Sequence, residues 1–397
     1  LLKFQINADN FLNLQNFSPA ILTIFKTAQL FGIPSYGDQL ALLWSLVVLT
    51  MLLVLEIVSF WKLIRSLREI NQNPGDSLSA RLSGTIFYGN ALLSLPISWK
   101  FLNNWKNLSN FWFIGIHHSG LKIPPDRSIR MRVIFVGWFV AVGAFVEHML
   151  SMMSATGLQC PANKYLETYI LNSHGFLLHK HEYSVWLAIP IFIISKLATI
   201  LWNFQDLIII LISIGLASRY NQLNSYVKRI ISYEKNEKNW FQKELLNRIM
   251  IWRKIRHAYL HQSKLVRKID ESLGLLVLLS NLNNLYFICL QLFLGIRTDN
   301  SELIEDIYYL YSLAWLLLRA SFVVLAASEV NLHSTRALLS LNSCTSRNYN
   351  IEIKRLIYQL SHQEISLSGM GFFYLYRQKL LEVCFSDKYY NRVLIQW

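Results

Sequence analysis

Residues 185–217 read VWLAIPIFIISKLATILWNFQDLIIILISIGLA, and this stretch decides what kind of fold the chain can adopt. A helix crosses a bilayer with about 20 apolar residues, so the stretch is too long for one straight crossing. Pro190 either separates an outer segment from the span or starts the helix early and lets it project outward. We therefore predict a membrane helix at 195–217, preceded by a second apolar segment.

Other parts of the chain show apolar runs of similar length. The further predicted spans are 40–61, 82–103, 131–155, 272–295, 308–330 and a less apolar 372–397. The composition agrees, because 53% of the residues are hydrophobic and 16% are charged, against about 25% charged in soluble domains. We expect an all-α polytopic membrane protein with seven transmembrane helices, forming a single domain over residues 1–397.

The basic residues indicate the orientation of the chain. Lys and Arg accumulate in cytoplasmic loops, and here they crowd the connection between the fourth and fifth spans, whereas the loop between the third and fourth spans has only Lys164 and Lys180. The N-terminus is therefore expected in the cytoplasm and, with seven spans, the C-terminus outside. The net charge of +14 is assigned to this bias, and no nucleic acid partner is expected.

The connection at 219–271 is predicted to be a cytoplasmic helical extension. Its apolar residues recur at helical intervals among the basic ones, with a hairpin expected near 234–238. Two roles remain open for it. It could form an assembly platform between subunits, or its charges could simply make a solvated or lipid-facing surface.

The last residues, 366–397, read SLSGMGFFYLYRQKLLEVCFSDKYYNRVLIQW. They resemble the C-terminal signature of insect gustatory receptors, which is Thr-Tyr, five mostly apolar residues, then Gln-Phe. Tyr390 and Gln396 match the signature, Trp397 takes the place of the Phe, and Tyr389 replaces the Thr. In that family the signature lies on the last membrane helix and lines an ion pore.

Upstream segments resemble the sugar-sensing branch of the same family. They are GTIFYGNALLSL (84–95), FVEHMLSM (145–152), LWNFQDLIIILISIGLASRYNQLN (201–224), LLVLLSNLNNLYFICLQL (275–292) and ASEVN (327–331). The resemblance implies a tetrameric, nonselective cation channel that mono- or disaccharides open, in the plasma membrane of gustatory neuron dendrites. It also implies a homo- or heterotetramer in membrane lipid, a pore helix at 372–397, permeating cations and no cofactor.

Polar side chains within the spans are the candidates for ligand contact, because ionisable groups at membrane depth are costly and mark function. The predicted ligand-binding residues are Glu147, His148, Trp202, Asp206, Tyr286, Gln291, Tyr311 and Trp315. Carboxylates and amides bind vicinal hydroxyls, and aromatic rings cover the C–H face of a sugar. Packing remains the alternative, with Asp206 and Arg319 as a buried ion pair and the aromatic residues as an interfacial belt.

The predicted pore and gate residues are Tyr390, Ile395, Gln396 and Trp397. On a helix, Lys388 and Arg392 share the face of Gln396, and fourfold rings of these cations would favour anions over cations. Three outcomes stay open. The basic face could point away from the pore, the permeation could have shifted, or conduction could be impaired.

Other classes of protein fit the sequence less well. The sequence shows no nucleophile, phosphate or metal motif, and its four cysteines lack metal spacing, so an enzyme and a metal site are not expected. A G-protein-coupled receptor is disfavoured by the charge bias. An odorant-receptor-type channel subunit and a non-conducting accessory subunit remain as alternatives.

Overall fold

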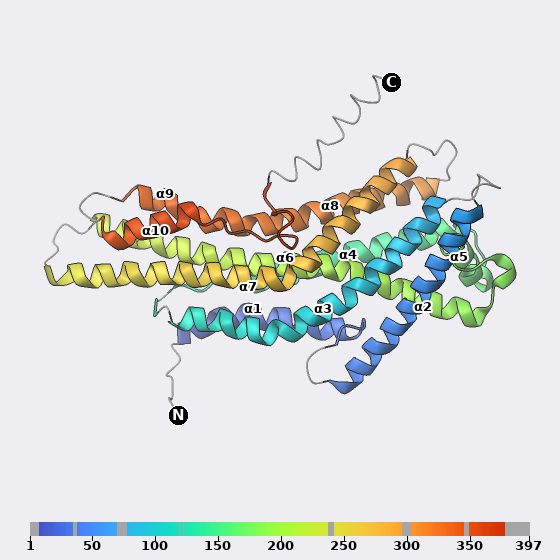
Figure 1. Ribbon diagram of the computed structural model, residues 1–397, viewed down its shortest axis with the longest axis horizontal. Helices are drawn as coiled ribbons and strands as arrows, with labels where there is room; N and C mark the ends of the chain where they lie inside the picture. Colours follow the sequence, from blue (N-terminus) through green and yellow to red (C-terminus); the bar gives the residue numbers. More distant parts are fainter. Residues whose placement is uncertain are drawn as a thin grey trace, which may run out of the picture.

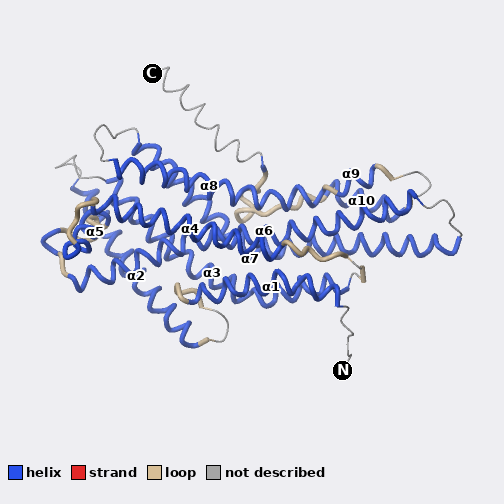
Figure 2. Tube along the Cα trace, turned by 180° about the vertical axis from the view of Figure 1, so that it is seen from behind, coloured by secondary structure: helices blue, strands red, loops and turns tan. Residues whose placement is uncertain are grey.

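The computed structural model describes residues 8–34, 38–69, 78–118, 120–121, 123–236, 242–295, 303–344 and 349–377. Over these residues the chain is all-helical, with no strand beyond an isolated bridge between Ser368 and Tyr374. Figure 2 shows how little of the described chain lies outside helices.

The described helices run mostly along the long axis of the molecule (Figure 1). They are α1 Ala8–Gln29, α2 Gln39–Glu69, α3 Leu78–His118, α4 Ile129–Thr156, α5 Tyr165–Ser173, α6 Val185–Asn236, α7 Gln242–Gly295, α8 Leu303–Thr335, α9 Ala337–Asn342 and α10 Ile351–His362. Six predicted spans fall inside α2, α3, α4, α6, α7 and α8. Helix α6 is continuous through Pro190, so the helix begins early and projects beyond the span.

Helices α2, α4, α6, α7 and α8 are long and apolar enough to cross a membrane, and the chain is a multi-pass membrane protein. Helix α3 is less apolar and carries several buried polar residues. Thr85, Asn90, Ser94 and Ser98 of this helix are all buried against other helices. Small and hydroxyl-bearing residues favour such contacts within a membrane, where helices approach each other closely.

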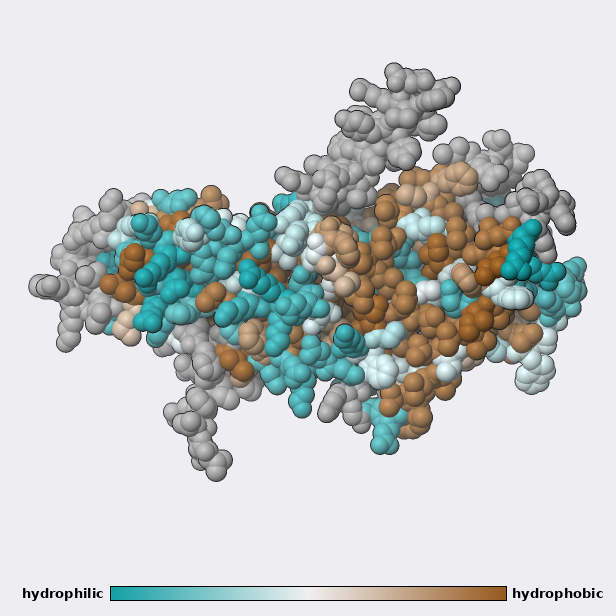
Figure 3. Space-filling model, viewed as in Figure 1, coloured by the Kyte–Doolittle hydropathy of each residue, from teal (hydrophilic) through white to brown (hydrophobic). Residues whose placement is uncertain are grey.

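The surface divides into an apolar region and two polar ends (Figure 3). Hydrophobic residues gather over the part where α2, α3 and α8 lie, and hydrophilic residues cover the end formed by α7, α9 and α10 as well as the tip near α5. This pattern is that of a membrane protein whose ends are in water. The basic connection predicted at 219–271 lies at the α9–α10 end, and its two arms belong to α6 and α7.

The arms of α6 and α7 beyond the membrane spans are packed rather than loose. The Tyr259 hydroxyl donates to Asn224 Oδ1 at 2.6 Å, and Arg256 pairs with Glu352 of α10 at 2.7 Å. Trp252 is fully buried between these helices. The hydrogen-bonded contacts make this end a helical bundle in its own right.

Helix α1 was not predicted from the sequence. It lies against α3, α4 and α6 and buries Phe17, Ile21 and Phe25 on one face. The Phe25 ring meets Trp105 of α3 edge-on, with ring centroids 5.5 Å apart. Because its apolar residues are interleaved with polar ones, the helix did not register as a membrane span.

The predicted pore helix at 372–397 does not begin at 372. Residues 367–375 form a tight turn, in which Gly369 N donates to Phe373 O at 3.0 Å and Leu375 N donates to Leu367 O at 2.9 Å. Asp270 of α7 fixes this turn, since it accepts from the backbone and the hydroxyl of Ser368 at 2.6 and 2.7 Å. Tyr390, Ile395, Gln396 and Trp397 lie outside the described residues.

Candidate functional site

A pocket of about 760 Å³ opens between α3, α4, α6, α7 and α8, at the end of the molecule where α5 lies. Its size falls within the range of about 300–1,000 Å³ that is usual for small-molecule sites. Four of the predicted ligand residues line it, namely Glu147 and His148 on α4, Trp202 on α6 and Gln291 on α7. We call this cavity the outer pocket, because it lies toward the α5 end of the molecule.

A chain of hydrogen bonds joins three helices at the wall of the outer pocket. Gln291 Nε2 donates to the Ser312 hydroxyl at 2.7 Å, and that hydroxyl donates to Glu147 Oε1 at 3.0 Å. The chain crosses from α7 through α8 to α4. These hydrogen bonds hold the Glu147 carboxylate at the pocket and engage only one of its two oxygens.

Three wall residues keep a buried polar atom without a hydrogen-bond partner in the described part of the protein. These atoms are His148 Nε2, His174 Nε2 and Gln291 Oε1. Buried polar atoms are almost always paired in folded proteins, and an unpaired one costs stability. Their concentration at one pocket indicates a site for a ligand that carries several hydrogen-bonding groups.

Aromatic side chains form the other part of the wall. The rings of Trp202 and Phe287 lie 4.7 Å apart, and Phe87 meets Trp202 nearly edge-on at 6.3 Å. Tyr308 and Tyr309 of α8 also line the pocket. Such a mixture of flat apolar faces and a few polar groups suits a ligand that is polar at its edges and apolar on its faces.

The loop between α4 and α6 closes part of the outer pocket, and the sequence did not reveal this role. Tyr169, His174 and Phe176 of the loop all line the pocket. Phe176 rests directly on α3 at Gly84, where any side chain would overlap its ring, since a Cβ there would lie 2.2 Å from the ring. The Tyr88 hydroxyl reaches His174 Nδ1 at 3.4 Å.

Lys62 of α2 ties down the far end of this loop. Its ammonium donates to Leu177 O and to Glu182 Oε2, both at 2.7 Å. The hydrogen bond from Lys62, together with one from the backbone of His179, lowers the pKa of Glu182 to about 2. The carboxylate therefore remains charged, and the contact with Lys62 remains in place, at any physiological pH.

Replacing Lys62 by Met is expected to loosen the loop without unfolding the receptor. Losing these partly exposed contacts weakens the loop by about 1 kcal/mol, which corresponds to about fivefold faster amide exchange. Hydrogen exchange of residues 177–182 measures the effect. Lys180→Met is the matched control, because Lys180 is an exposed lysine of the same loop. Equal exchange in both variants would remove Lys62 as the anchor.

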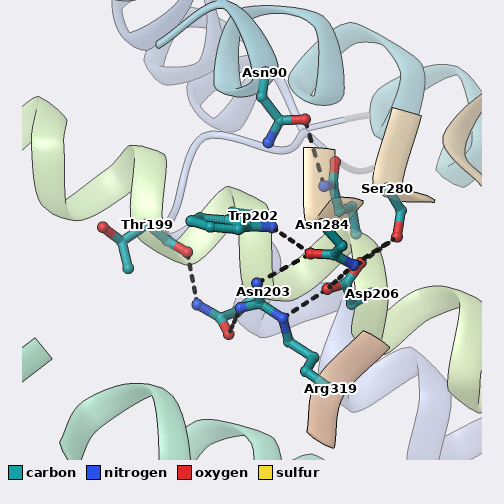
Figure 4. A network of polar contacts seen from close by, with 9 residues as sticks. Asn90, Thr199, Trp202, Asn203, Asp206, Ser280, Asn284 and Arg319 are labelled. Carbon is teal, nitrogen blue, oxygen red and sulfur yellow. Dashed lines mark hydrogen bonds and ion pairs between the residues drawn. The ribbon is translucent and has the colours of Figure 1, made fainter. Parts of the chain in front are cut away.

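Asp206 does not line the outer pocket but lies beneath it in a buried polar network (Figure 4). Arg319 Nε lies 2.8 Å from Asp206 Oδ2, and the two side chains are 1% and 0% exposed. Ser280 donates to the same carboxylate, and Asn284 Nδ2 donates to it at 3.2 Å. The ion pair, which the sequence left as an alternative to ligand contact, is what the structure shows.

The same network supports the floor of the pocket. Trp202 Nε1 donates to Asn284 Oδ1 at 3.1 Å, and the Arg319 guanidinium lies 4.5 Å from the centre of the Trp202 ring (Figure 4). Arg319 also donates to Asn203 at 2.6 Å. Trp202 therefore has one face toward the pocket, while its indole is fixed by groups from α7 and α8.

The remaining predicted ligand residues lie away from the outer pocket. Tyr311 and Trp315 line a separate groove of about 480 Å³ between α4 and α8. The Trp315 ring covers Gly143, where a Cβ would lie 2.2 Å from the ring, and Tyr311 donates to Gly143 O at 3.2 Å. Tyr286 is half-buried and meets Phe287 edge-on at 5.2 Å.

Comparison with solved structures identifies the class of this fold. The insect olfactory receptor OR5 from Machilis hrabei superposes with a TM-score of 0.67 at 13% identity, covering 97% of this chain and 99% of that one. The same receptor in complex with eugenol superposes with a TM-score of 0.65. The chain therefore has the same fold as this olfactory receptor.

Sequence comparison gives the family. A sequence model described as trehalose receptor matches residues 3–397. The Drosophila melanogaster gustatory receptor for sugar taste 64a is 29% identical over 331 residues, which are 79% of this chain and 68% of that receptor. The gustatory receptor 5a for trehalose of the same organism is 28% identical over 314 residues, covering 76% and 67%.

The chain belongs to the trehalose receptor family, within the sugar branch of the insect gustatory receptors. It spans about two thirds of the length of the curated relatives that it matches. Family membership confirms the resemblance inferred from the tail and the upstream segments. It also confirms that the chain is a receptor and not an enzyme.

Proposed function

We propose that this chain is a subunit of a sugar-gated, nonselective cation channel, and that the sugar binds in the outer pocket. The main support for the proposal is the composition of the pocket wall, which combines a carboxylate and unpartnered polar atoms with aromatic rings. The relatives named for sugar taste and for trehalose support the same ligand class.

Each part of the wall has a role in sugar binding under this proposal. Glu147 accepts hydrogen bonds from two neighbouring hydroxyls, and Gln291 and His148 bind others. Trp202 and Phe287 cover the apolar face of the ring. Because hydrogen bonds to a charged group contribute about 1.5–3 kcal/mol, Glu147 is the residue on which affinity depends most.

The proposed topology has seven spans with the N-terminus inside the cell. The basic arms of α6 and α7 lie at one end of the molecule and the outer pocket at the other, so the positive-inside rule supports a pocket on the extracellular side. A pocket that opens outward is accessible to sugars in the medium. The proposed location is the plasma membrane of gustatory neuron dendrites.

The proposed assembly is a homo- or heterotetramer whose pore is lined by residues 372–397. Asp270 and Gly274 of α7 hold the turn at 367–375, which includes the first residues of this segment, and Gly274 lies against the backbone of Met370. A movement of α7 would therefore reach the base of the proposed pore helix directly.

Gln396→Ala is expected to change the current or its gating while the receptor still reaches the cell surface. The amide offers the polar contact at the predicted constriction, and Ala removes it. Whole-cell recording together with surface labelling measures both quantities. Asn221→Ala, which removes an amide side chain at an exposed position on α6, is the control. Unchanged currents would exclude Gln396 from the pore.

The proposed function as a whole is tested by whole-cell recording in a heterologous cell. A panel of mono- and disaccharides is applied, and the external cations are then replaced one at a time. The expected result is an inward current that at least one sugar opens and that several monovalent cations carry. No sugar-dependent current from the chain alone or with a second receptor would overturn the proposal.

A non-conducting accessory subunit is the second candidate, and a feature of the tail favours it. If residues 372–397 form the proposed pore helix, Lys388 and Arg392 share the face of Gln396, and rings of these cations would oppose cation flow. Co-expression with a second gustatory receptor separates the two candidates. An accessory subunit would change the currents of its partner but give none by itself, and Lys388→Gln with Arg392→Gln should restore a current if the basic rings are what blocks it.

A further inference from the structure

A second cavity, of about 930 Å³, lies between α1, α4 and α6 and is distinct from the outer pocket. Its walls are mostly apolar and include Ile24 of α1, Ala144 and Phe145 of α4, and Ile200 and Phe204 of α6. We call it the α1–α4–α6 groove. Helices α4 and α6 are both membrane spans, so the groove lies at bilayer depth.

Two cationic side chains line this groove, the exposed Arg130 at the start of α4 and the half-buried Lys196 of α6. Lys196 Nζ donates to the Tyr169 hydroxyl at 2.8 Å and lies 4.2 and 4.4 Å from the ring centres of Tyr169 and Phe192. No carboxylate of the described residues lies within ion-pair distance of it. An ammonium has three donors, and a half-buried cation without a counterion is costly. An anionic group is thus the missing partner.

The position of Lys196 specifies what kind of anion could reach it. Lys196 is the second residue of the predicted span 195–217, and its partner Tyr169 belongs to the outer loop, so the ammonium lies at the outer boundary of the membrane. This is the depth of lipid headgroups. Lysine is a common binder of phosphate, and the phosphate of a phospholipid is the anion present at that depth.

The length of the groove fits an acyl chain. Along α6 the lining continues from Lys196 to Leu207, which is about 16 Å at 1.5 Å per residue. The hydrocarbon core of a bilayer is about 30 Å thick, so the α6 wall below Lys196 is about one leaflet deep. Along α4 the lining is longer, from Met152 to Arg130, which is about 33 Å. A lipid whose phosphate meets Lys196 would therefore extend one acyl chain along the part of the groove that α6 lines below Lys196.

We propose that the α1–α4–α6 groove binds an outer-leaflet phospholipid, with its phosphate on Lys196 and one acyl chain between α4 and α6. The groove and the outer pocket share His148 and Thr199. The lipid would therefore lie one side chain away from a bound sugar. That consequence for sugar binding rests on the proposed function, and the choice of the outer leaflet rests on the proposed topology, whereas lipid binding itself rests on neither.

The test uses the full chain, purified and reconstituted, and a phosphatidylcholine that carries a photoactivatable acyl chain. Cross-linked peptides are mapped and counted by mass spectrometry. Labelling is expected in α4 and α6 at the groove. Lys196→Met should reduce it about tenfold, the value for one charged hydrogen bond, while Lys196→Arg retains it. Lys164→Met, at an exposed lysine outside the groove, should label like the wild type.

Diacylglycerol with the same photoactivatable chain is the matched probe without a phosphate. The labelling of the wild type by diacylglycerol should be no higher than the labelling of Lys196→Met by phosphatidylcholine. Equal labelling by the two probes, or undiminished labelling of Lys196→Met, would overturn the proposal. Competition by palmitate that is as strong as competition by phosphatidylcholine would also overturn the proposal. Cross-links from the groove to a neighbouring subunit would do the same. Size-exclusion profiles of each variant separate loss of binding from loss of folding.

Discussion

Replacing Asp206 by Asn is expected to remove most of the folded receptor from the cell surface. The change keeps the shape of the side chain but leaves the Arg319 guanidinium buried without a counterion. Breaking a buried ion pair on one side costs about 3–5 kcal/mol, which is a large fraction of the stability of a typical domain. Surface labelling and the thermal melting of detergent-solubilised receptor measure the loss.

Two comparison variants show whether the charge is responsible. The double variant Asp206→Asn with Arg319→Met should recover much of the stability, because removing both charges leaves none unpaired. Glu329→Gln breaks the exposed contact with Arg377 and should cost at most about 1 kcal/mol. If the double variant melts no higher than the single one, the loss comes from the hydrogen bonds of Ser280 and Asn284 instead.

Much of the fold followed from the sequence because the membrane imposes a simple rule. Any run of about 20 apolar residues must either cross the bilayer or be buried, so six predicted spans fall within observed helices. Helix α1 was not predicted because its apolar residues, such as Phe17 and Ile21, occupy only one face. The turn at 367–375 was not predicted because Asp270, which fixes it, lies in a distant part of the sequence.

The candidate site was predictable only where a polar side chain falls inside a span. Searching for polar side chains within spans found Glu147, His148 and Gln291, but it also selected Asp206. The free-energy cost of burying a polar group does not reveal whether a ligand or another side chain compensates that cost. The contact with Arg319 depends on how α6 and α8 are rotated against each other. His174 gave no signal at all, since it lies in a loop that folds back over the pocket.

Rotation of α8 also explains the aromatic residues that lie outside the pocket. Ser312 and Leu316 are one turn apart and line the outer pocket, whereas Tyr311 and Trp315 occupy the adjacent face and meet α4. Composition gives no preference between these faces, because both carry residues suited to a ligand. The close approach at Gly143 fixes the choice, since only a glycine admits the Trp315 ring there.

Glu147→Gln is expected to raise the half-maximal sugar concentration by about ten- to a hundredfold. The variant loses a charged acceptor, whose hydrogen bonds contribute about 1.5–3 kcal/mol, and each 1.4 kcal/mol is a factor of ten in affinity. Concentration–response curves for the activating sugar measure the shift. Glu305→Gln, at an exposed position near the start of α8, removes the same charge outside the pocket and should leave the curve in place.

A packing role for Glu147 predicts a different pattern. The Ser312 hydroxyl that donates to Glu147 can still donate to the amide oxygen of the substituted side chain, so Glu147→Gln keeps the bond between α4 and α8 and should melt within about 1 kcal/mol of the wild type. Ser312→Ala breaks that bond but leaves the carboxylate free for the ligand. A shifted curve in Glu147→Gln with a smaller shift in Ser312→Ala supports direct contact with sugar. An unshifted curve in Glu147→Gln would mean that the sugar binds elsewhere. A larger shift in Ser312→Ala than in Glu147→Gln would mean that Glu147 acts by holding the helices together.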